Sequence, residues 1–414
     1  MGAKMWKLVI GFLIVLSVAV FGGIVFLVYG YTRVNSNNED DGAYVEMDVL
    51  HQDEVMQVVD KVENDEGEEN QIELSEELEE VNDEVILQVY GGVFDLPLYG
   101  ATGFAPVFMP VRGSPDLNST AVIDLSPGTG FTILEEQGEW WQIEVDGLKG
   151  WVLHGYCFIN LPDVMPSIVY NITNARSSVI RSSGVEVPSV TGYSLYESFT
   201  YNPRLGREEF IVPILYSTGK KVANAQEIAL GEGNTLVIVE AFRPLSTQML
   251  IVDRLGTLAG ENQVVHQGLN QGPWSMGWFI ATGVSTHQTG AAIDVSLAQV
   301  NETIEIAIGN YSTIKIMDYT EYTMPSPIHE LSVQAVVLAY PMSTTDPHGW
   351  SNATLAATMN EAAITLQRYL IEAGFTPLAS EWWHFDDHQS SHRIRYNSSQ
   401  GDFVLNQIFS QVPE

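Results

Sequence analysis

Hydrophobic and polar positions divide the chain into stretches of different pattern. The first stretch is continuously apolar, the second is strongly acidic, and the third alternates short apolar runs with Gly, Pro, Asp and Asn. In the last stretch, longer apolar runs follow both strand and helix periods. We predict a membrane anchor over 1–34, a linker over 35–84, a small β module over 85–162 and an α+β domain over 163–414.

Strand and turn signals follow one another between residues 110 and 161. Runs such as Phe131-Thr-Ile-Leu and Trp141-Gln-Ile-Glu-Val are separated by turn residues. The dipeptide Asp146-Gly147 between two such runs favours a tight hairpin. This region therefore predicts a small barrel of about five to seven strands.

The region after residue 162 mixes strands and helices. Predicted strands are Thr235–Glu240, Ala291–Leu297 and Thr313–Met317, and predicted helices are Ser246–Leu258 and Ala353–Ala373, the latter ending at Gly374. The two kinds of element do not alternate regularly, and the sequence has no phosphate-binding loop motif. A doubly wound nucleotide-binding fold is therefore not expected.

Residues Leu8–Tyr31 form 24 consecutive residues without a charged side chain. About 20 apolar residues span a bilayer as a helix. Because Lys4 and Lys7 precede this stretch and an acidic flank follows it, we expect a single-pass anchor with the N-terminus in the cytoplasm and the remaining domains outside. The alternative is a cleaved signal peptide, whose apolar core usually has only ~7–15 residues and ends at a small-residue cleavage site.

The chain is acidic, with 52 Asp and Glu against 18 Lys and Arg and a net charge of −34. Nucleic acids and anionic membrane surfaces need clustered positive charge, so we expect no nucleic-acid partner. Residues 35–84 contain 20 of the acidic residues, which predicts a disordered, solvated spacer. The single cysteine, Cys157, excludes an intrachain disulfide and a cysteine-based metal cluster.

The stretch Ser285–Asp294 contains the first half of a candidate metal site. His287 and Asp294 are seven residues apart, and on a regular strand this odd separation points their side chains to opposite faces. Gly290 between them can supply the turn that brings them together. A catalytic zinc site typically has three protein ligands and a position for water, so one ligand is still needed.

The stretch Glu381-Trp-Trp-His384 contains the second half. His384 is the third candidate ligand, and Glu381 is a candidate base that takes a proton from water and passes it to the leaving amine. Their three-residue spacing on a strand predicts an irregular strand end. We expect Trp382 and Trp383 to exclude water from the site, and Arg243, at the end of a predicted strand, to stabilise the developing oxyanion.

Part of the predicted barrel resembles a known family. The segments Val111-Arg-Gly-Ser-Pro, Gly138-Glu-Trp-Trp-Gln-Ile and Gly147-Leu-Lys-Gly-Trp-Val are similar to bacterial SH3 domains. Such modules commonly recruit enzymes to the cell wall. The resemblance implies that this module binds peptidoglycan.

The candidate metal site resembles a second family. Ser285-x-His-x-x-Gly-x-Ala-x-Asp294 and Glu381-Trp-Trp-His384, together with Ala241-Phe-Arg-Pro244, are similar to the zinc D-Ala-D-Ala dipeptidases and their carboxypeptidase relatives. The resemblance implies a Hedgehog/DD-peptidase-like α+β fold with one Zn²⁺ held by His287, Asp294 and His384. It further implies that Glu381 is the base, that Arg243 stabilises the transition state, and that Ser285 holds the amino end of the substrate.

One segment departs from this family. Met324-Pro-Ser-Pro-Ile-His329 stands where the dipeptidases have Met-Gly-Thr-Pro-Phe-Asp, whose Asp binds the substrate ammonium, and we predict that Glu330 replaces it. The predicted function is a zinc peptidase outside a bacterial membrane that hydrolyses D-Ala-D-Ala bonds of peptidoglycan peptides, as a D,D-carboxypeptidase or D,D-dipeptidase. The alternatives are a non-catalytic wall-binding or sensor protein and an L,D-endopeptidase of stem peptides.

Overall fold

The computed structural model describes residues 87–394 and 399–414. The predicted anchor Leu8–Tyr31 and the acidic linker 35–84 lie outside these residues. Within the described residues, no helix combines the length and the apolar character that a membrane crossing requires.

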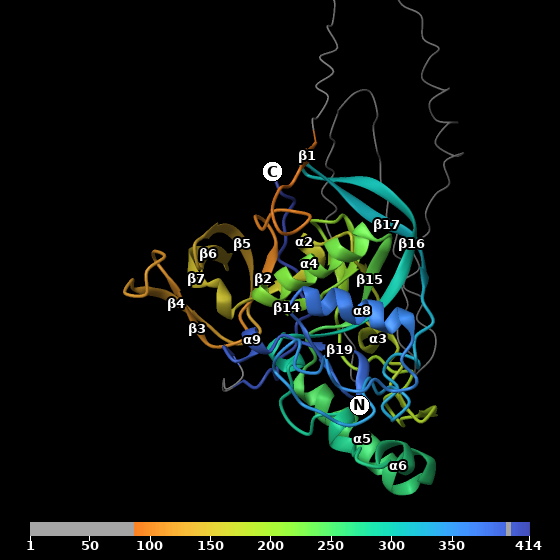
Figure 1. The fold of residues 1–414 in the computed structure, drawn as a ribbon. Helices are drawn as coiled ribbons and strands as arrows, with labels where there is room; N and C mark the ends of the chain where they lie inside the picture. The colour runs from red at the N-terminus through yellow and green to blue at the C-terminus, as the bar shows by residue number, and fades with distance from the viewer. Residues whose placement is uncertain (1–86, 395–398) are drawn as a thin grey trace, which may run out of the picture. The chain divides into compact units, whose positions relative to one another are not determined.

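The predicted β module is part of an eight-stranded sheet with the order β14-β8-β2-β5-β6-β7-β3-β4. Its strands are β2 (Thr102–Phe104), β3 (Met109–Arg112), β4 (Ala121–Leu125), β5 (Gly130–Gln137), β6 (Trp140–Val145), β7 (Leu148–Leu153), β8 (Phe158–Asn160) and β14 (Pro213–Leu215). Figure 1 shows β2 to β7 in orange and yellow. The hairpin β6–β7 turns at Asp146 and Gly147, whose φ angles of 49° and 76° confirm the tight turn predicted from this dipeptide.

Side chains alternate between the two faces of β6, as the period of a strand requires. Trp141, Ile143 and Val145 are buried, whereas Trp140 lies at the partly exposed rim. Cys157 is a free, fully buried cysteine that packs in the same core. The inward-facing side chains of β6 therefore belong to the core, whereas β2 and β8 are buried along their whole length.

The barrel continues directly into the α+β part. Strand β14 comes from the sequence after residue 162 and pairs antiparallel with β8. At this junction the carboxylate of Asp163 accepts hydrogen bonds from Thr102 N (2.8 Å) and from the side chain of Asn202 (2.6 Å), and Arg204 Nε donates to the backbone oxygen of Asp163 (2.7 Å). Because all these groups are buried, the junction is a rigid part of the fold rather than a linker.

The second sheet has seven strands and contains the predicted metal ligands. It has the order β1-β17-β16-β15-β9, and β19 pairs with both β16 and β18. Its strands are β1 (Gln88–Val89), β9 (Val169–Tyr170), β15 (Asn234–Glu240), β16 (Ala292–Ile308), β17 (Tyr311–Glu321), β18 (Thr376–Leu378) and β19 (Glu381–Asp386). The three strands predicted from the sequence lie within or next to β15, β16 and β17, so this part of the prediction is confirmed.

Helices α4 (Tyr216–Gly231) and α8 (Glu361–Glu372) pack against each other and against this sheet (Figure 1). The helix predicted at Ser246–Leu258 is α5 (Leu245–Glu261). The start predicted for the last helix, at Ala353, is wrong. Helix α8 begins after Asn360, because the Asn360 side chain accepts a hydrogen bond from Ala363 N and caps the helix there.

Shorter elements complete the fold. They are α2 (Leu161–Val164), α3 (Thr173–Arg176), α6 (Gln263–Leu269), α7 (Met276–Phe279), α9 (His388–Ser391), the 3₁₀ turns η1 (His154–Tyr156) and η2 (His287–Thr289), and the hairpins β10 (Arg181–Ser182) with β11 (Val185–Glu186) and β12 (Phe199–Asn202) with β13 (Arg207–Phe210). Among them, η2 leads directly into β16 and carries the first candidate ligand. The structure is thus a mixed α/β fold with an SH3-like barrel.

Candidate metal centre

The sheet brings the three candidate ligands together at the start of β16. Asp294 on β16 lies opposite His384 on the neighbouring strand β19, and His287 lies in η2, just before β16. The chain turns between them at Gly290, which has a φ of 62°. A Cβ atom at this position would lie 2.5 Å from the Phe158 ring, so only glycine fits.

The ligand atoms are spaced as the corners of a metal site are. Oδ1 of Asp294 lies 3.0 Å from Nδ1 of His384 and 3.4 Å from Nε2 of His287, and the two nitrogens are 3.2 Å apart. Four ligands placed tetrahedrally at 2.0–2.1 Å from zinc are about 3.3–3.4 Å from one another. These three residues therefore fit a zinc-sized cation.

In His287 and His384, the ring nitrogen that points away from the other candidate ligands (the outer nitrogen) lies next to a hydrogen-bond acceptor, which sets the tautomer of the ring. His287 Nδ1 lies 2.6 Å from the backbone oxygen of Ala241, and His384 Nε2 lies 3.0 Å from Oδ1 of Asp386. If each outer nitrogen donates its hydrogen, the inner nitrogens both present lone pairs to the same point. Two lone pairs and a carboxylate at this distance require a shared positive charge.

The electrostatics of the cluster agree with this requirement. Although burial alone lowers the pKa of His384, the carboxylates of Asp386 and Asp294 raise it well above its usual range. Burial likewise raises the pKa of Asp294, but the neighbouring histidines, His287 first, hold it well below its usual range. Without a metal ion, the positive charge beside the ionised Asp294 is thus a proton on His384, which a bound cation would have to displace.

Arg243 is buried beside the cluster. Its guanidinium donates to the Glu240 carboxylate through Nε (2.7 Å) and Nη2, to Gln248 Oε1 through Nη1 (2.7 Å), and to Asp294 Oδ2 through Nη2 (3.3 Å). This arrangement is a buried network rather than a surface ion pair. It places a permanent positive charge next to the carboxylate of Asp294, a candidate ligand.

Glu381 is the first residue of β19, and its pKa is affected by the charges of His384, Asp294 and Arg243. The register of the β18–β19 pairing shifts between Leu378↔Glu381 and Pro377↔Phe385, which is the strand irregularity predicted from the spacing of Glu381 and His384. Burial raises the pKa of Glu381 to about 8, and the negative charge of Asp294 adds to this effect. The Glu381 side chain is buried, which agrees with desolvation as the largest cause of this shift.

The tryptophans form part of the wall beside the cluster. Both rings are almost fully buried and meet edge to face, with centroids 5.3 Å apart. The Trp382 indole N–H donates to Ser326 Oγ (3.0 Å), and the Trp383 ring lies against the ring of His329. The segment that departs from the family pattern, Met324–His329, therefore packs against both tryptophans.

The two remaining predicted substrate residues have partners within the protein. Ser285 donates to Gln288 Oε1 through its backbone N (2.6 Å) and its hydroxyl (2.8 Å). The buried carboxylate of Glu330 accepts hydrogen bonds from Ser183 N, Gly184 N (3.0 Å) and Ser332 Oγ (2.6 Å). The structure does not bring Glu330 into the metal cluster, and substrate binding by these residues stays a prediction.

A residue that the sequence reasoning missed lies in the cluster instead. His329 Nε2 is 3.0 Å from Oδ2 of Asp294. The segment Met324–His329 departs from the family pattern, but this departure indicates only the loss of an acidic residue and not a contact of His329 with Asp294.

A second set of close acidic and imidazole groups, Glu240, Asp294 and His329, does not make a second cation site. The Glu240 carboxylate already accepts hydrogen bonds from Asn174 (2.7 Å) and Tyr196 (2.9 Å) and forms the ion pair with Arg243. Because Arg243 supplies the counter-charge, these residues favour a single ion, at the first cluster.

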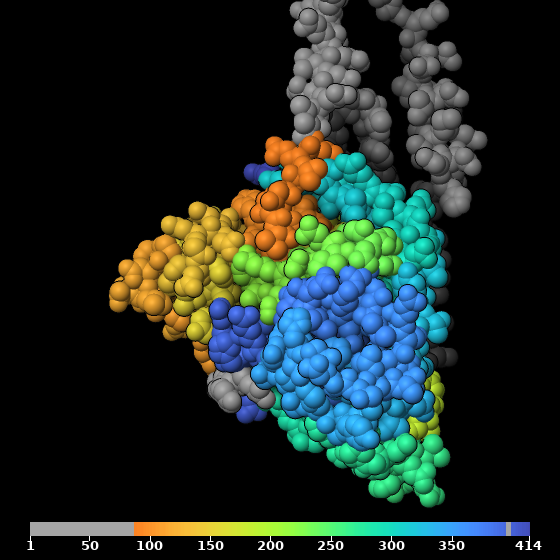
Figure 2. All heavy atoms as spheres, viewed as in Figure 1, coloured from red at the N-terminus to blue at the C-terminus, as the bar shows by residue number. Residues whose placement is uncertain are grey.

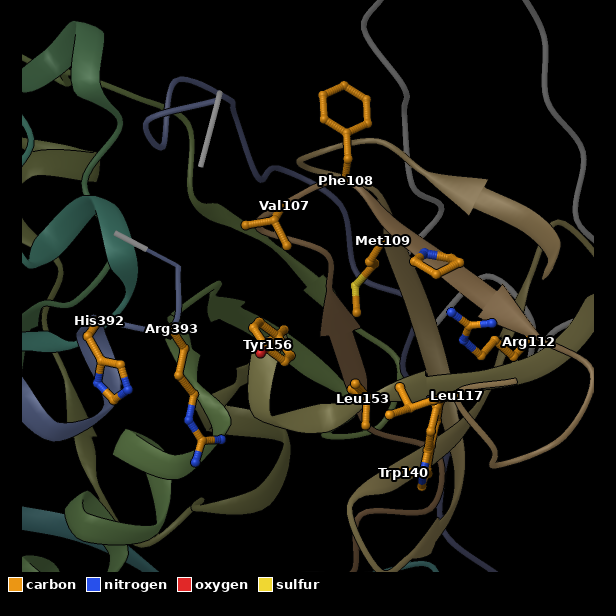
Figure 3. A pocket seen from close by; sticks show the side chains of 11 residues that line it. Val107, Phe108, Met109, Arg112, Leu117, Trp140, Leu153, Tyr156, His392 and Arg393 are labelled. Carbon is orange, nitrogen blue, oxygen red and sulfur yellow. The ribbon is translucent and has the colours of Figure 1, made fainter. Parts of the chain in front are cut away.

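The barrel carries a separate groove of about 590 Å³ (Figure 3). Seven apolar or aromatic side chains and Pro110 line it, together with the basic side chains of Arg112, His392 and Arg393 and no acidic residue. His392 and Arg393 belong to the segment after β19, which Figure 2 shows in dark blue beside the yellow barrel. In an acidic protein, this groove combines apolar surface with positive charge.

Comparison with known proteins supports the barrel assignment. Residues 108–157 match the sequence profile of the family described as Bacterial SH3 domain, which confirms the prediction for this module. No curated protein sequence matches the chain. The match to this family therefore covers about 50 residues of the chain.

One similar solved structure is described as "Structure of the LdcB LD-carboxypeptidase reveals the molecular basis of peptidoglycan recognition". It is 16% identical, and the alignment covers 64% of this chain and 90% of that chain with a TM-score of 0.23. A TM-score this low does not define a shared fold. The interpretation of the metal centre therefore rests on its own geometry.

Proposed function

We propose that the protein is a zinc-dependent D,D-peptidase that hydrolyses D-Ala-D-Ala bonds in peptidoglycan peptides. The observation that carries the proposal is the convergence of His287, Asp294 and His384 at 3.0–3.4 Å from one another. The nearby buried Glu381 and Arg243 supply an acceptor and a positive charge, the two further groups that amide hydrolysis needs.

Zinc bound by the three ligands would lower the pKa of a water molecule and polarise the scissile carbonyl. Glu381 then takes the proton of the attacking water and delivers it to the leaving amine. Its pKa of about 8 without a metal ion falls when a divalent cation is bound nearby, because the positive charge favours the carboxylate. Arg243 stabilises the negative charge that develops on the carbonyl oxygen, and the tryptophans keep bulk water out.

We propose that the SH3 barrel binds the enzyme to the wall. Its groove is suited to a ligand with apolar side chains and carboxylates, which stem peptides have. We further propose that Leu8–Tyr31 anchors the protein in a bacterial membrane with both domains outside, where this substrate is located.

The proposed reaction is tested with the full-length protein and three substrates. These are a stem pentapeptide ending in D-Ala-D-Ala, the corresponding tetrapeptide, and free D-Ala-D-Ala, with products identified by mass spectrometry. The proposal predicts loss of the terminal D-Ala from the pentapeptide. Cleavage of the free dipeptide alone would assign a dipeptidase, whereas cleavage of the tetrapeptide but not the pentapeptide, or of none of the three, would contradict D,D-specificity.

A further inference from the structure

His329 has an unfavourable backbone conformation that its neighbours enforce. Its φ of 60° lies in the left-handed region, which is unfavourable for a residue with a Cβ atom. The backbone oxygen of His329 accepts a hydrogen bond from Arg181 N (3.1 Å), and the next side chain, Glu330, is fixed by Ser183 and Gly184. Backbone strain of this kind persists where surrounding contacts determine it, and it is concentrated at functional sites.

The enforced conformation holds the His329 imidazole between Asp294 and Trp383. Nε2 lies 3.0 Å from Oδ2 of Asp294, and the ring meets the Trp383 ring edge to face with centroids 5.9 Å apart. Nδ1 is buried without a hydrogen-bond partner among the described residues. Because an ionised carboxylate only accepts hydrogen bonds, Nε2 is the nitrogen that carries the hydrogen.

The two oxygens of Asp294 therefore have different tasks. Oδ2 faces the donors His329 Nε2 and Arg243 Nη2, at 3.0 and 3.3 Å. Oδ1 faces the inner nitrogens of His287 and His384. A carboxylate with both donors on one oxygen has only the other oxygen free for a cation.

We propose that His329 is a positioning residue that makes Asp294 bind the metal ion through Oδ1 alone. Binding through both oxygens would occupy an additional coordination position, which a catalytic zinc site needs for water or substrate. Arg243 also donates a hydrogen bond to Oδ2 of Asp294, but from the longer distance of 3.3 Å and while it is paired with Glu240. This inference rests on the proposed function, since it requires a metal ion at the three ligands.

Two variants of full-length protein separate the hydrogen bond from the backbone conformation. His329→Gln keeps an N–H donor at about the position of Nε2, whereas His329→Gly suits the left-handed backbone and removes the donor. Zinc affinity is measured by competition with a chromophoric chelator. The visible absorption of the Co²⁺-substituted protein is recorded as well, because its intensity falls as the coordination number rises.

We expect His329→Gly to bind zinc roughly 10–100-fold more weakly, the range typical of lost outer partners of metal ligands, and to show weaker Co²⁺ absorption. His329→Gln should retain most of both properties. Ser189→Gly is the matched control, since Ser189 is an exposed residue that also has a positive φ. If His329→Gly binds both ions as wild type does, the inference is wrong while the proposed function stands; if the wild type binds neither ion, both are wrong.

Discussion

Asp294 and His384 are directly opposite each other on the antiparallel strands β16 and β19, with Oδ1 of one 3.0 Å from Nδ1 of the other. Strand pairing thus determines this half of the cluster, and the backbone of a central sheet is among the most rigid parts of a protein. Only His287 depends on a turn, and Gly290 fixes that turn against Phe158. The candidate ligands are therefore held in position before an ion binds, which favours affinity.

Replacement of Glu381 tests its role as the base. Glu381→Gln removes the proton acceptor but keeps the size of the side chain, so we expect peptide hydrolysis to fall by about 10²–10⁴-fold. Zinc content should not change, since Glu381 is not one of the three ligands. Glu227→Gln, on the exposed surface of α4, is the control; equal rates for Glu381→Gln and this control would refute the assignment.

The raised pKa of Glu381 predicts how stability depends on pH in the metal-free protein. The carboxyl has an ordinary pKa of 4.5 and a pKa of about 8 when folded, so the folded state binds this proton more tightly. Its contribution to stability is complete below pH 4.5 and is lost as the pH rises through 8. Urea unfolding of chelator-treated protein at the two ends of this range should show that Glu381→Gln gains stability relative to wild type as the pH rises. Parallel pH dependence of the two proteins would show that the folded pKa is not raised.

Arg243 is predicted to stabilise the fold as well as the transition state. Arg243→Ala leaves the buried carboxylate of Glu240 without its counter-charge, and breaking a buried pair in this way typically costs about 3–5 kcal/mol. Urea denaturation measures this loss. The double variant Arg243→Ala with Glu240→Gln should recover part of the stability but none of the hydrolytic activity. Full activity of either variant would exclude Arg243 from catalysis.

Most of the candidate metal centre could be predicted from the sequence because its residues lie in two short segments. Ser285–Asp294 contains two candidate ligands and the glycine turn that brings them together, and Glu381–His384 contains the third candidate ligand beside a strand irregularity. The barrel was predictable for the same reason, since alternation and the Asp146-Gly147 turn are local signals.

The missed features depend on contacts between distant parts of the chain. His329 reaches Asp294 across 35 residues of sequence, and nothing adjacent to His329 indicates that contact. Likewise, β14 joins the barrel sheet by pairing with β8, more than 50 residues earlier by the numbering of its partners. The spacing of apolar residues alone predicts a start of α8 that is too early, because the capping side chain of Asn360 determines where the helix begins.

The groove on the barrel is predicted to bind peptidoglycan independently of catalysis. Trp140 lies at its edge (Figure 3), and Trp140→Ala should weaken binding to insoluble peptidoglycan in a sedimentation assay by about tenfold or more, as expected for an aromatic side chain that dominates an interface. Hydrolysis of soluble peptides should not change. Tyr201→Ala removes an exposed aromatic side chain outside the groove and is the control. Unchanged sedimentation of Trp140→Ala would mean that the wall is bound elsewhere.

The zinc content of the purified full-length protein tests the central claim most directly. Elemental analysis should find about one zinc ion per chain in the wild type, as for a catalytic site with three protein ligands, and in the control His266→Ala, which changes an exposed histidine outside the cluster. The variants His287→Ala, Asp294→Ala and His384→Ala should each lose most of this zinc while remaining folded. A wild type without bound metal, or variants that retain it in full, would contradict the assignment of these three residues as the metal centre.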